Sequence, residues 1–242
     1  PRFRGRQERP AAPTGRTVLA GRHEFFVREI GPADGPPLVL IPAWEALYDR
    51  ARLSTGQTLL VHGGAGGVGH VAVQLGRLRG ARVATTVSSG AKAERVRDLG
   101  VERALLYTER DFVDQVMEWT DGRGVDAALD IVGGKTLERT CAAVAPYGDL
   151  VTVLQPDPEM DWSEARNRNL RFGFELMLTP MIMGLAEGLA HQGNILDECG
   201  RWLDKGQLHI DVAHTFPLNR AAEAHATLEA GHMDGKIVLT MD

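Results

Sequence analysis

Residues 59–70 decide the fold, and their sequence is Leu59-Leu60-Val61-His62-Gly63-Gly64-Ala65-Gly66-Gly67-Val68-Gly69-His70. An apolar run typical of a buried strand ends in a glycine cluster, and a helical pattern follows at once. Gly64, Gly66 and Gly69 satisfy G-x-G-x-x-G, the dinucleotide-binding fingerprint, in the strand–turn–helix setting that gives the motif its meaning. The first glycine permits a tight turn, the second lets the backbone approach a diphosphate, and the third lets the helix pack close to the strand.

The rest of the chain alternates between strand and helix patterns. Strands are predicted over residues 58–62, 81–87, 104–107, 125–132, 150–154, 170–176 and 236–241. Helices are predicted over residues 43–51, 68–78, 91–99, 110–119, 135–145 and 178–204, the last one interrupted near Gly193-Asn194, and another helix is predicted to begin at an Asn219 N-cap. This alternation predicts an α/β fold, a doubly wound parallel sheet (Rossmann fold) with helices on both faces.

The first 42 residues depart from this alternation. Residues 1–15 are rich in Arg, Pro and Gly and are predicted to be unstructured, whereas residues 24–30 and 38–41 are strand-like and flank a Gly/Pro-rich loop. We therefore expect a basic arm with a short β-rich, hairpin-like appendage over residues 1–42 and a dinucleotide-binding domain with a C-terminal helix and strand over residues 43–242. Residues 1–30 hold seven Arg against three Glu, which we interpret as a solvated arm and not as a nucleic-acid tail.

Composition and charge indicate which classes of binding partner and which cellular compartment to expect. A net charge of −5 with 24% charged residues gives no sign of a nucleic-acid or membrane surface. The most apolar segment, residues 176–190, is interrupted by Pro180 and Glu187 and is too short to span a bilayer. Cys141 and Cys199 are isolated and are predicted to be buried thiols, and no secretory pattern follows the basic start, so we expect a cytoplasmic protein.

The choice of nucleotide depends on the segment after the second strand of the sheet. An acidic residue about 20 positions beyond the glycines holds the ribose of NAD, but residues 84–90 contain no Asp or Glu. They offer the hydroxyls of Ser88 and Ser89, with Lys92 just beyond, and a hydroxyl with an ammonium suits a 2′-phosphate. We therefore predict NADPH as the coenzyme. Alternatively, Ser88 caps the next helix and Lys92 is a surface lysine, although this explanation leaves the missing acid unexplained.

Three further residues, at the ends of two predicted strands, lie where ligands of open α/β sheets bind. Tyr107 ends one predicted strand and could line the adenine end of the crevice, although such a residue is more often a half-buried strand aromatic. Val132 and Gly133 follow another strand at its carboxyl end, and a plain strand-to-helix turn explains them equally well.

The sequence lacks the motifs of metal sites and of several other enzyme classes. No C-x-x-C or H-E-x-x-H spacing occurs, so no metal site is predicted. None of the serines lies in the G-x-S-x-G of a hydrolase nucleophile elbow, and no Tyr has a Lys four positions on. No side chain stands out as an obligatory proton donor, so no catalytic residue is assigned.

Together these pieces resemble the medium-chain dehydrogenase/reductase superfamily, in its zinc-independent quinone oxidoreductase branch. The resemblance covers residues 43–242 and rests on five pieces in order: Ala43-Trp44-Glu45-Ala46-Leu47, the loop at residues 62–69, Ser88-Ser89-Gly90-Ala91-Lys92, Asp130-Ile131-Val132-Gly133-Gly134, and Pro217-Leu218 followed by Gly235-Lys236-Ile237-Val238-Leu239. Family members carry a whole N-terminal catalytic domain ahead of residue 43. Residues 24–41 resemble instead the opening strands of an α/β-hydrolase.

The resemblance implies hydride transfer from NADPH to a small electron acceptor, a quinone or an α,β-unsaturated carbonyl compound, without zinc or flavin. It implies that the pyrophosphate lies on the glycine loop, and that Ser88, Lys92 and Tyr107 surround the 2′-phosphate. The loop residues expected to contact the coenzyme are Gly64, Ala65, Gly66, Gly67, Val68 and Gly69. It also implies a homodimer formed through an edge strand near residues 171–176. The alternative is a nucleotide-binding module that binds NADPH without turnover.

Overall fold

The computed structural model describes residues 16–20, 23–27, 40–231 and 234–240. Contacts between Cα atoms divide the chain into two units, Pro1–Pro37 and Leu38–Asp242. The described part of the first unit is an antiparallel pair of strands, β1 (Arg16–Ala20) and β2 (His23–Val27), with Arg16 opposite Val27. The predictions for residues 1–15 and for the loop at 31–37 lie outside the described residues. The domain boundary proposed at residue 42 stays a prediction.

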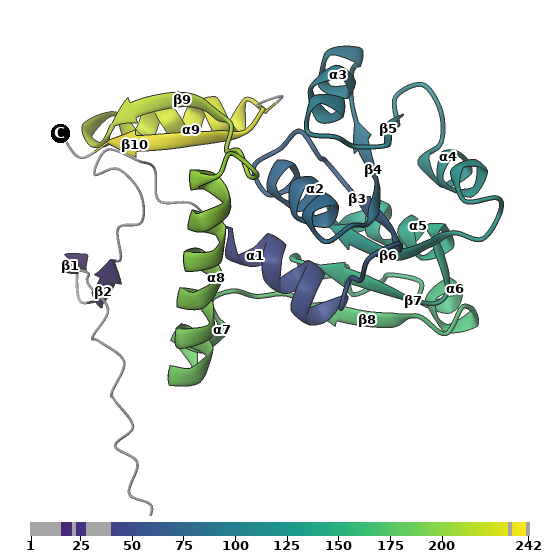
Figure 1. Cartoon of the computed structure of the whole chain (residues 1–242), viewed down its shortest axis with the longest axis horizontal. Helices are drawn as coiled ribbons and strands as arrows, with labels where there is room; N and C mark the ends of the chain where they lie inside the picture. Colours follow the sequence, from purple (N-terminus) through teal and green to yellow (C-terminus); the bar gives the residue numbers. More distant parts are fainter. Residues whose placement is uncertain (1–15, 21–22, 28–39, 232–233, 241–242) are drawn as a thin grey trace, which may run out of the picture. The chain divides into compact units, whose positions relative to one another are not determined.

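A six-stranded parallel sheet forms the centre of the second unit, with the strand order β5-β4-β3-β6-β7-β8 (Figure 1). Its strands are β3 (Thr58–Val61), β4 (Arg82–Val87), β5 (Arg103–Leu106), β6 (Val125–Asp130), β7 (Val144–Thr152) and β8 (Arg171–Phe174). All four residues of β3 are buried, as expected for a strand covered on both faces. The predicted doubly wound parallel sheet is confirmed.

Helices cover both faces of this sheet. They are α1 (Ile41–Trp44), which continues as the π-helical segment η1 (Glu45–Arg50), α2 (Gly69–Leu78), α3 (Gly90–Asp98), α4 (Phe112–Trp119), α5 (Gly134–Ala143) and α6 (Ser163–Asn167). Alternate residues of one strand serve opposite faces. Leu59 and Val61 of β3 pack in one core with α1, α2 and α3, whereas Leu60 packs in a second core with α4, α5 and α6.

Several element boundaries differ from the prediction. Residue 41 begins α1 and does not end a strand, because Pro42 in the first turn favours a helix start. α5 ends at Ala143, and β7 begins at Val144, six residues before the predicted strand, because Val144 pairs with Val125.

The predicted interruption of the long C-terminal helix at Gly193-Asn194 is wrong. α7 (Thr179–Ile182) and α8 (Ala186–Asp204) are separated at residues 183–185, where Gly184 has a φ of +66°. Gly193 lies inside α8, where Gln192 and Ile195 are buried. Packing of this helix face therefore overrides the weak helix propensity of glycine.

The chain closes with β9 (Val212–Pro217), the 3-10 turn η2 (Leu218–Arg220), α9 (Ala221–Glu229) and β10 (Lys236–Thr240). β9 and β10 pair in parallel as a separate two-stranded sheet. Asn219 lies within η2 and does not cap α9, so that prediction is wrong. No helix among the described residues is both long and apolar enough to cross a membrane.

Candidate functional site

The candidate site lies at the carboxyl edge of the parallel sheet. The strand order reverses between β3 and β6, because β4 and β5 follow β3 on one side, and β7 and β8 follow β6 on the other. Ligands of open α/β sheets bind in the crevice at such a switch point. The glycine loop at residues 62–69 leaves β3 there, and the backbone N–H of His62 donates to the carbonyl of Leu129 in β6 at 3.0 Å.

Two glycines of the loop are required by close packing. A Cβ added to Gly64 would lie 2.2 Å from Oγ1 of Thr85 on β4, and one added to Gly69 would lie 2.1 Å from the carbonyl oxygen of Gly63. Thr85 cannot easily move away, because its buried hydroxyl donates to the carbonyl of Val61 at 2.6 Å. The first and third glycines of the fingerprint therefore bring strand, loop and helix together, as their spacing predicts.

The middle of the loop has a different environment. Apart from its chain neighbours, a Cβ added to Gly66 would lie no nearer than 3.3 Å to any atom, and the three atoms nearest to one added to Gly67 would all belong to the side chain of Lys236. α2 begins at Gly69, and no described side chain caps its N-terminus at Val68. The His70 N–H already donates to the Gly66 carbonyl at 3.0 Å. The other N–H groups of the first turn and the side-chain-free surface of Gly66 fit the diphosphate of a dinucleotide.

The two histidines beside the loop are structural. Both nitrogens of buried His62 are engaged, Nδ1 with Thr86 Oγ1 at 3.2 Å and Nε2 with Thr140 Oγ1 at 2.8 Å, and burial lowers its pKa to about 3. His70 Nδ1 contacts the carbonyl of Gly66 at 2.9 Å, and its Nε2 accepts from the N–H of Asp211 at 3.2 Å. Burial lowers the pKa of His70 as well, so neither ring is suited to act as a proton donor.

A cavity of about 300 Å³ opens beside the loop between the ends of β3, β4, β5 and β6. Its lining residues are His62, Gly63, Thr86, Tyr107, Asp111, Phe112, Val132, Thr136 and Arg139. Tyr107 and Val132 are 52% and 53% exposed, so a ligand in the cavity can contact both side chains. Phe112 and Arg139 were missed from the sequence, since α4 and α5 come together only in the fold, where Arg139 pairs with Asp111 and lies over the Phe112 ring at 5.2 Å.

Asp130 holds the turn that carries Val132 and Gly133. Its fully buried carboxylate accepts from the N–H of Gly133 at 3.0 Å and from the hydroxyl of Thr152 at 3.0 Å. Burial raises the pKa of Asp130, and these hydrogen bonds oppose the rise. Gly133 has a φ of +76°, a conformation that favours glycine. The buried carboxylate therefore fixes the backbone of the turn at Val132 and Gly133.

The residues predicted near the 2′-phosphate gather after β4. Ser89, and not Ser88, caps α3, since its Oγ accepts from the N–H of Lys92 at 3.3 Å. The Lys92 ammonium lies 3.3 Å from Asp234 Oδ1, so a carboxylate from the C-terminal loop already faces it. Arg95 on the same helix donates to Asp211 at 3.0 Å. Residues 84–90 contain no acidic residue, but the fold brings Asp211 and Asp234 to α3.

Comparisons with known proteins agree with this geometry. The sequence profile of a family described as zinc-binding dehydrogenase matches residues 99–239. The hybrid PKS-NRPS synthetase pyvA of Aspergillus violaceofuscus is 32% identical over 98% of this chain and 7% of its own length. The 2-haloacrylate reductase of a Burkholderia species is 32% identical over 80% of this chain and 58% of that protein. Among solved structures, an alcohol dehydrogenase superfamily protein from Novosphingobium aromaticivorans has a TM-score of 0.77 and 33% identity over 85% of this chain and 62% of that one.

The chain belongs to the zinc-binding dehydrogenase family, and with it to the medium-chain dehydrogenase/reductase superfamily. It spans less than two thirds of the length of each of these three relatives. The family name implies zinc, but the described residues contain no group of three or more His, Cys, Asp or Glu side chains that could hold a metal ion.

Proposed function

We propose that this chain is the coenzyme-binding part of an NADPH-dependent oxidoreductase that passes hydride to a quinone or an α,β-unsaturated carbonyl compound, without zinc or flavin. The observation that carries the proposal is the glycine loop at the switch point, where packing requires Gly64 and Gly69 while Gly66 leaves room for a diphosphate. The similarity to a 2-haloacrylate reductase supports the unsaturated acceptor.

The chain's own residues would bind and orient the coenzyme. The loop and the first turn of α2 would hold the diphosphate by N–H groups. Tyr107 and Val132 would line the adenosine end, and Ser88, Ser89 and Lys92 would hold the ribose with its 2′-phosphate. A bound reduced nicotinamide supplies the hydride from its C4. The protein would contribute binding and orientation, and the proton donor stays unassigned because His62 and His70 are buried and fully bonded.

A second candidate function is coenzyme binding without turnover. It is favoured by the surroundings of the glycine loop, where His62 and His70 are buried with both ring nitrogens engaged and neither is suited to donate a proton.

Calorimetric titration with NADPH and with NADH tests both candidates at once. Gly66→Ala would place a methyl group where the proposed function puts the diphosphate, and this methyl meets no atom closer than 3.3 Å apart from its chain neighbours. The variant should therefore weaken binding roughly tenfold or more while leaving the fold intact. Gly173→Ala on β8, whose methyl would make only ordinary contacts at 3.5 Å and 3.7 Å, is the matched control. Absence of heat with both coenzymes would overturn the proposal.

Turnover separates the two candidates. NADPH is mixed with 1,4-benzoquinone or with an α,β-unsaturated acid, and the loss of nicotinamide absorbance is followed. Oxidation supports the reductase. Thermal stabilisation by NADPH without oxidation supports the binding module, because a ligand bound only by the folded state raises the unfolding midpoint.

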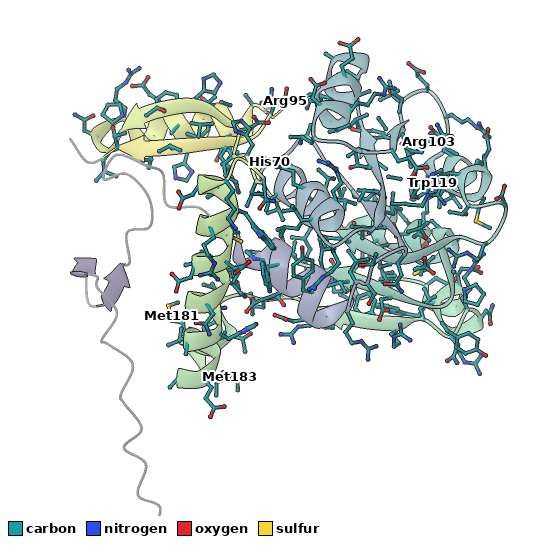
Figure 2. The ribbon with its side chains drawn as sticks, in the orientation of Figure 1. His70, Arg95, Arg103, Trp119, Met181 and Met183 are labelled. Atoms are coloured by element: carbon teal, nitrogen blue, oxygen red, sulfur yellow. The ribbon has the colours of Figure 1, made fainter. Side chains whose placement is uncertain are left out.

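We also propose that two copies pair through β8. Among the described residues, β8 has a strand neighbour only on its β7 side, and an open strand edge is a template for pairing. Large apolar side chains at the end of β8 and in the segment that follows it in the chain are more than half exposed, namely Phe174, Leu176, Ile182 and Met183. Figure 2 labels Met181 on α7 and Met183, which follows that helix. Sedimentation of Phe174→Glu should show a monomer, while Leu228→Glu on α9 keeps the dimer. A monomeric parent protein would contradict this proposal.

A further inference from the structure

A groove lies between α8 and the helical segment formed by α1 and η1, which contact each other (Figure 1). Its cavity of about 420 Å³ is within the range of small-molecule sites. Trp44 and Tyr48 line it from α1 and η1, Leu78 and Arg79 from the C-terminal end of α2, and Trp202 from α8. α2 has 10 residues and starts at the glycine loop, so a helix about 15 Å long separates the groove from that loop.

Three aromatic rings form one wall of the groove, and each is held in place. Trp44 and Trp202 stack with their ring centroids 5.3 Å apart and their planes 27° apart, and Tyr48 packs edge-on against Trp44 at 4.6 Å. The Tyr48 hydroxyl donates to the carbonyl of Leu75 at 2.7 Å. All three rings pack on the core but are only partly buried. Open aromatic surface of this kind favours a planar aromatic ligand, which can stack or pack edge-on.

The charged side chains that line the groove leave one cation without an acid. Arg201 Nε donates to Glu198 Oε2 at 3.0 Å, which neutralises both groups. His191 Nε2 lies 2.8 Å from Asp49 Oδ2. Arg79 forms no ion pair with any acid in the part of the chain that the structure describes. The groove is therefore complementary to a ligand that carries one negative charge.

The position of the Arg79 guanidinium indicates which anion fits. Its central carbon lies 3.8 Å from the centroid of the Tyr48 ring. A cation–π contact uses the face of the guanidinium, so the N–H groups in its plane stay available as a planar fork, which matches a carboxylate. A phosphate monoester would bring a second negative charge to a groove that already holds Glu198. The amide of Asn194 on α8 also lines the groove and can bond to a polar ligand atom.

We propose that the groove between α8 and the α1–η1 segment binds a planar aromatic carboxylate, with the ring of the ligand against Trp44 and Trp202 and its carboxylate on the Arg79 guanidinium. The groove shares no lining residue with the cavity beside the glycine loop. The ligand and a coenzyme can therefore be bound at the same time. This inference goes beyond the proposed function and does not depend on it.

Calorimetric titration of the full chain with 2-naphthoate tests the proposal. The matched ligand is 2-naphthylmethanol, which has the same rings without the charge. Arg79→Gln should weaken 2-naphthoate binding by roughly 10- to 100-fold, the range for loss of one charge-assisted hydrogen bond, and should leave 2-naphthylmethanol binding unchanged. Arg97→Gln, an exposed arginine on α3 outside the groove, is the control variant. Saturation with NADPH should leave the affinity for 2-naphthoate unchanged.

A second variant tests the charge of the groove while Arg79 stays in place. Asn194→Asp keeps the size of an exposed side chain on α8 and adds a carboxylate. It should weaken 2-naphthoate binding several-fold and spare 2-naphthylmethanol, and its thermal midpoint should stay that of the parent protein. If the parent does not bind 2-naphthoate, or if Arg79→Gln binds it equally well, the inference is overturned whether or not NADPH binds. Competition between 2-naphthoate and NADPH would place the probe at the glycine loop and would overturn the inference as well.

Discussion

Glu45 of η1 and Glu175, which follows β8, form a buried carboxyl pair whose titration can be tested with one substitution. They are only 6% and 3% exposed. Glu175 Oε2 accepts from Arg50 Nε at 3.1 Å, and Glu45 Oε1 accepts from Gln192 Nε2 at 3.1 Å. Glu175 Oε1 is buried without a protein donor among the described residues apart from the Glu45 carboxyl group. We infer that a proton shared by the two carboxyl groups supplies the missing hydrogen bond.

Burial, with the neighbouring Glu45 as the second cause, raises the pKa of Glu175 to about 8, and Arg50 opposes the rise. The ordinary value for the unfolded chain is 4.5. Between these two pH values the folded protein keeps a proton that the unfolded chain releases, so stability falls as the pH rises through this window. Each pH unit is worth ~1.4 kcal/mol, and the whole loss across this window is therefore on the order of 5 kcal/mol.

Glu175→Gln replaces the protonated carboxyl with a neutral amide of the same size, which can still donate to Glu45 and accept from Arg50. At pH 5 the variant and the parent should agree within about 1 kcal/mol, and at pH 9 the variant should be more stable by on the order of 4 kcal/mol. Urea unfolding at pH 5, 7 and 9 measures the difference, with Glu187→Gln on the exposed face of α8 as the control. Equal pH slopes for variant and parent would refute the shared proton.

Three other substitutions test the site. Gly64→Ala should lower the free energy of unfolding by about 1–3 kcal/mol, because its methyl group would overlap Thr85. Urea unfolding should show no such loss in Gly90→Ala. If Gly64→Ala has the same urea midpoint as the parent protein, the packing argument is contradicted. Lys92→Ala should weaken NADPH binding and spare NADH, and equal losses by calorimetry would refute the 2′-phosphate assignment. Asp234→Asn removes the carboxylate that faces Lys92 and should tighten NADPH binding several-fold, roughly the worth of one partly exposed ion pair; weaker binding would show that this acid helps to hold the nucleotide.

Local patterns were sufficient to predict the sheet and its glycine loop, but they failed where packing decides. The strand–glycine–helix sequence at residues 59–70 has only a few sterically allowed arrangements, so its structure follows from local rules. The break in the C-terminal helix could not be predicted, because burial of Gln192 and Ile195 keeps the helix intact through Gly193. The cap at α9 was misplaced because a 3-10 turn comes before that helix.

The sequence by itself determined the fold class, the position of the glycine loop and the family to which the chain belongs, since hydrophobic periodicity and glycine spacing are properties of neighbouring residues. Only the tertiary structure decided what surrounds the loop. It brought Lys236 onto Gly67, placed Asp234 against Lys92 and joined Glu45 to Glu175. These partners lie more than 100 positions apart in the chain, and contacts at such separations depend on how the strands are ordered and packed, which no local pattern records.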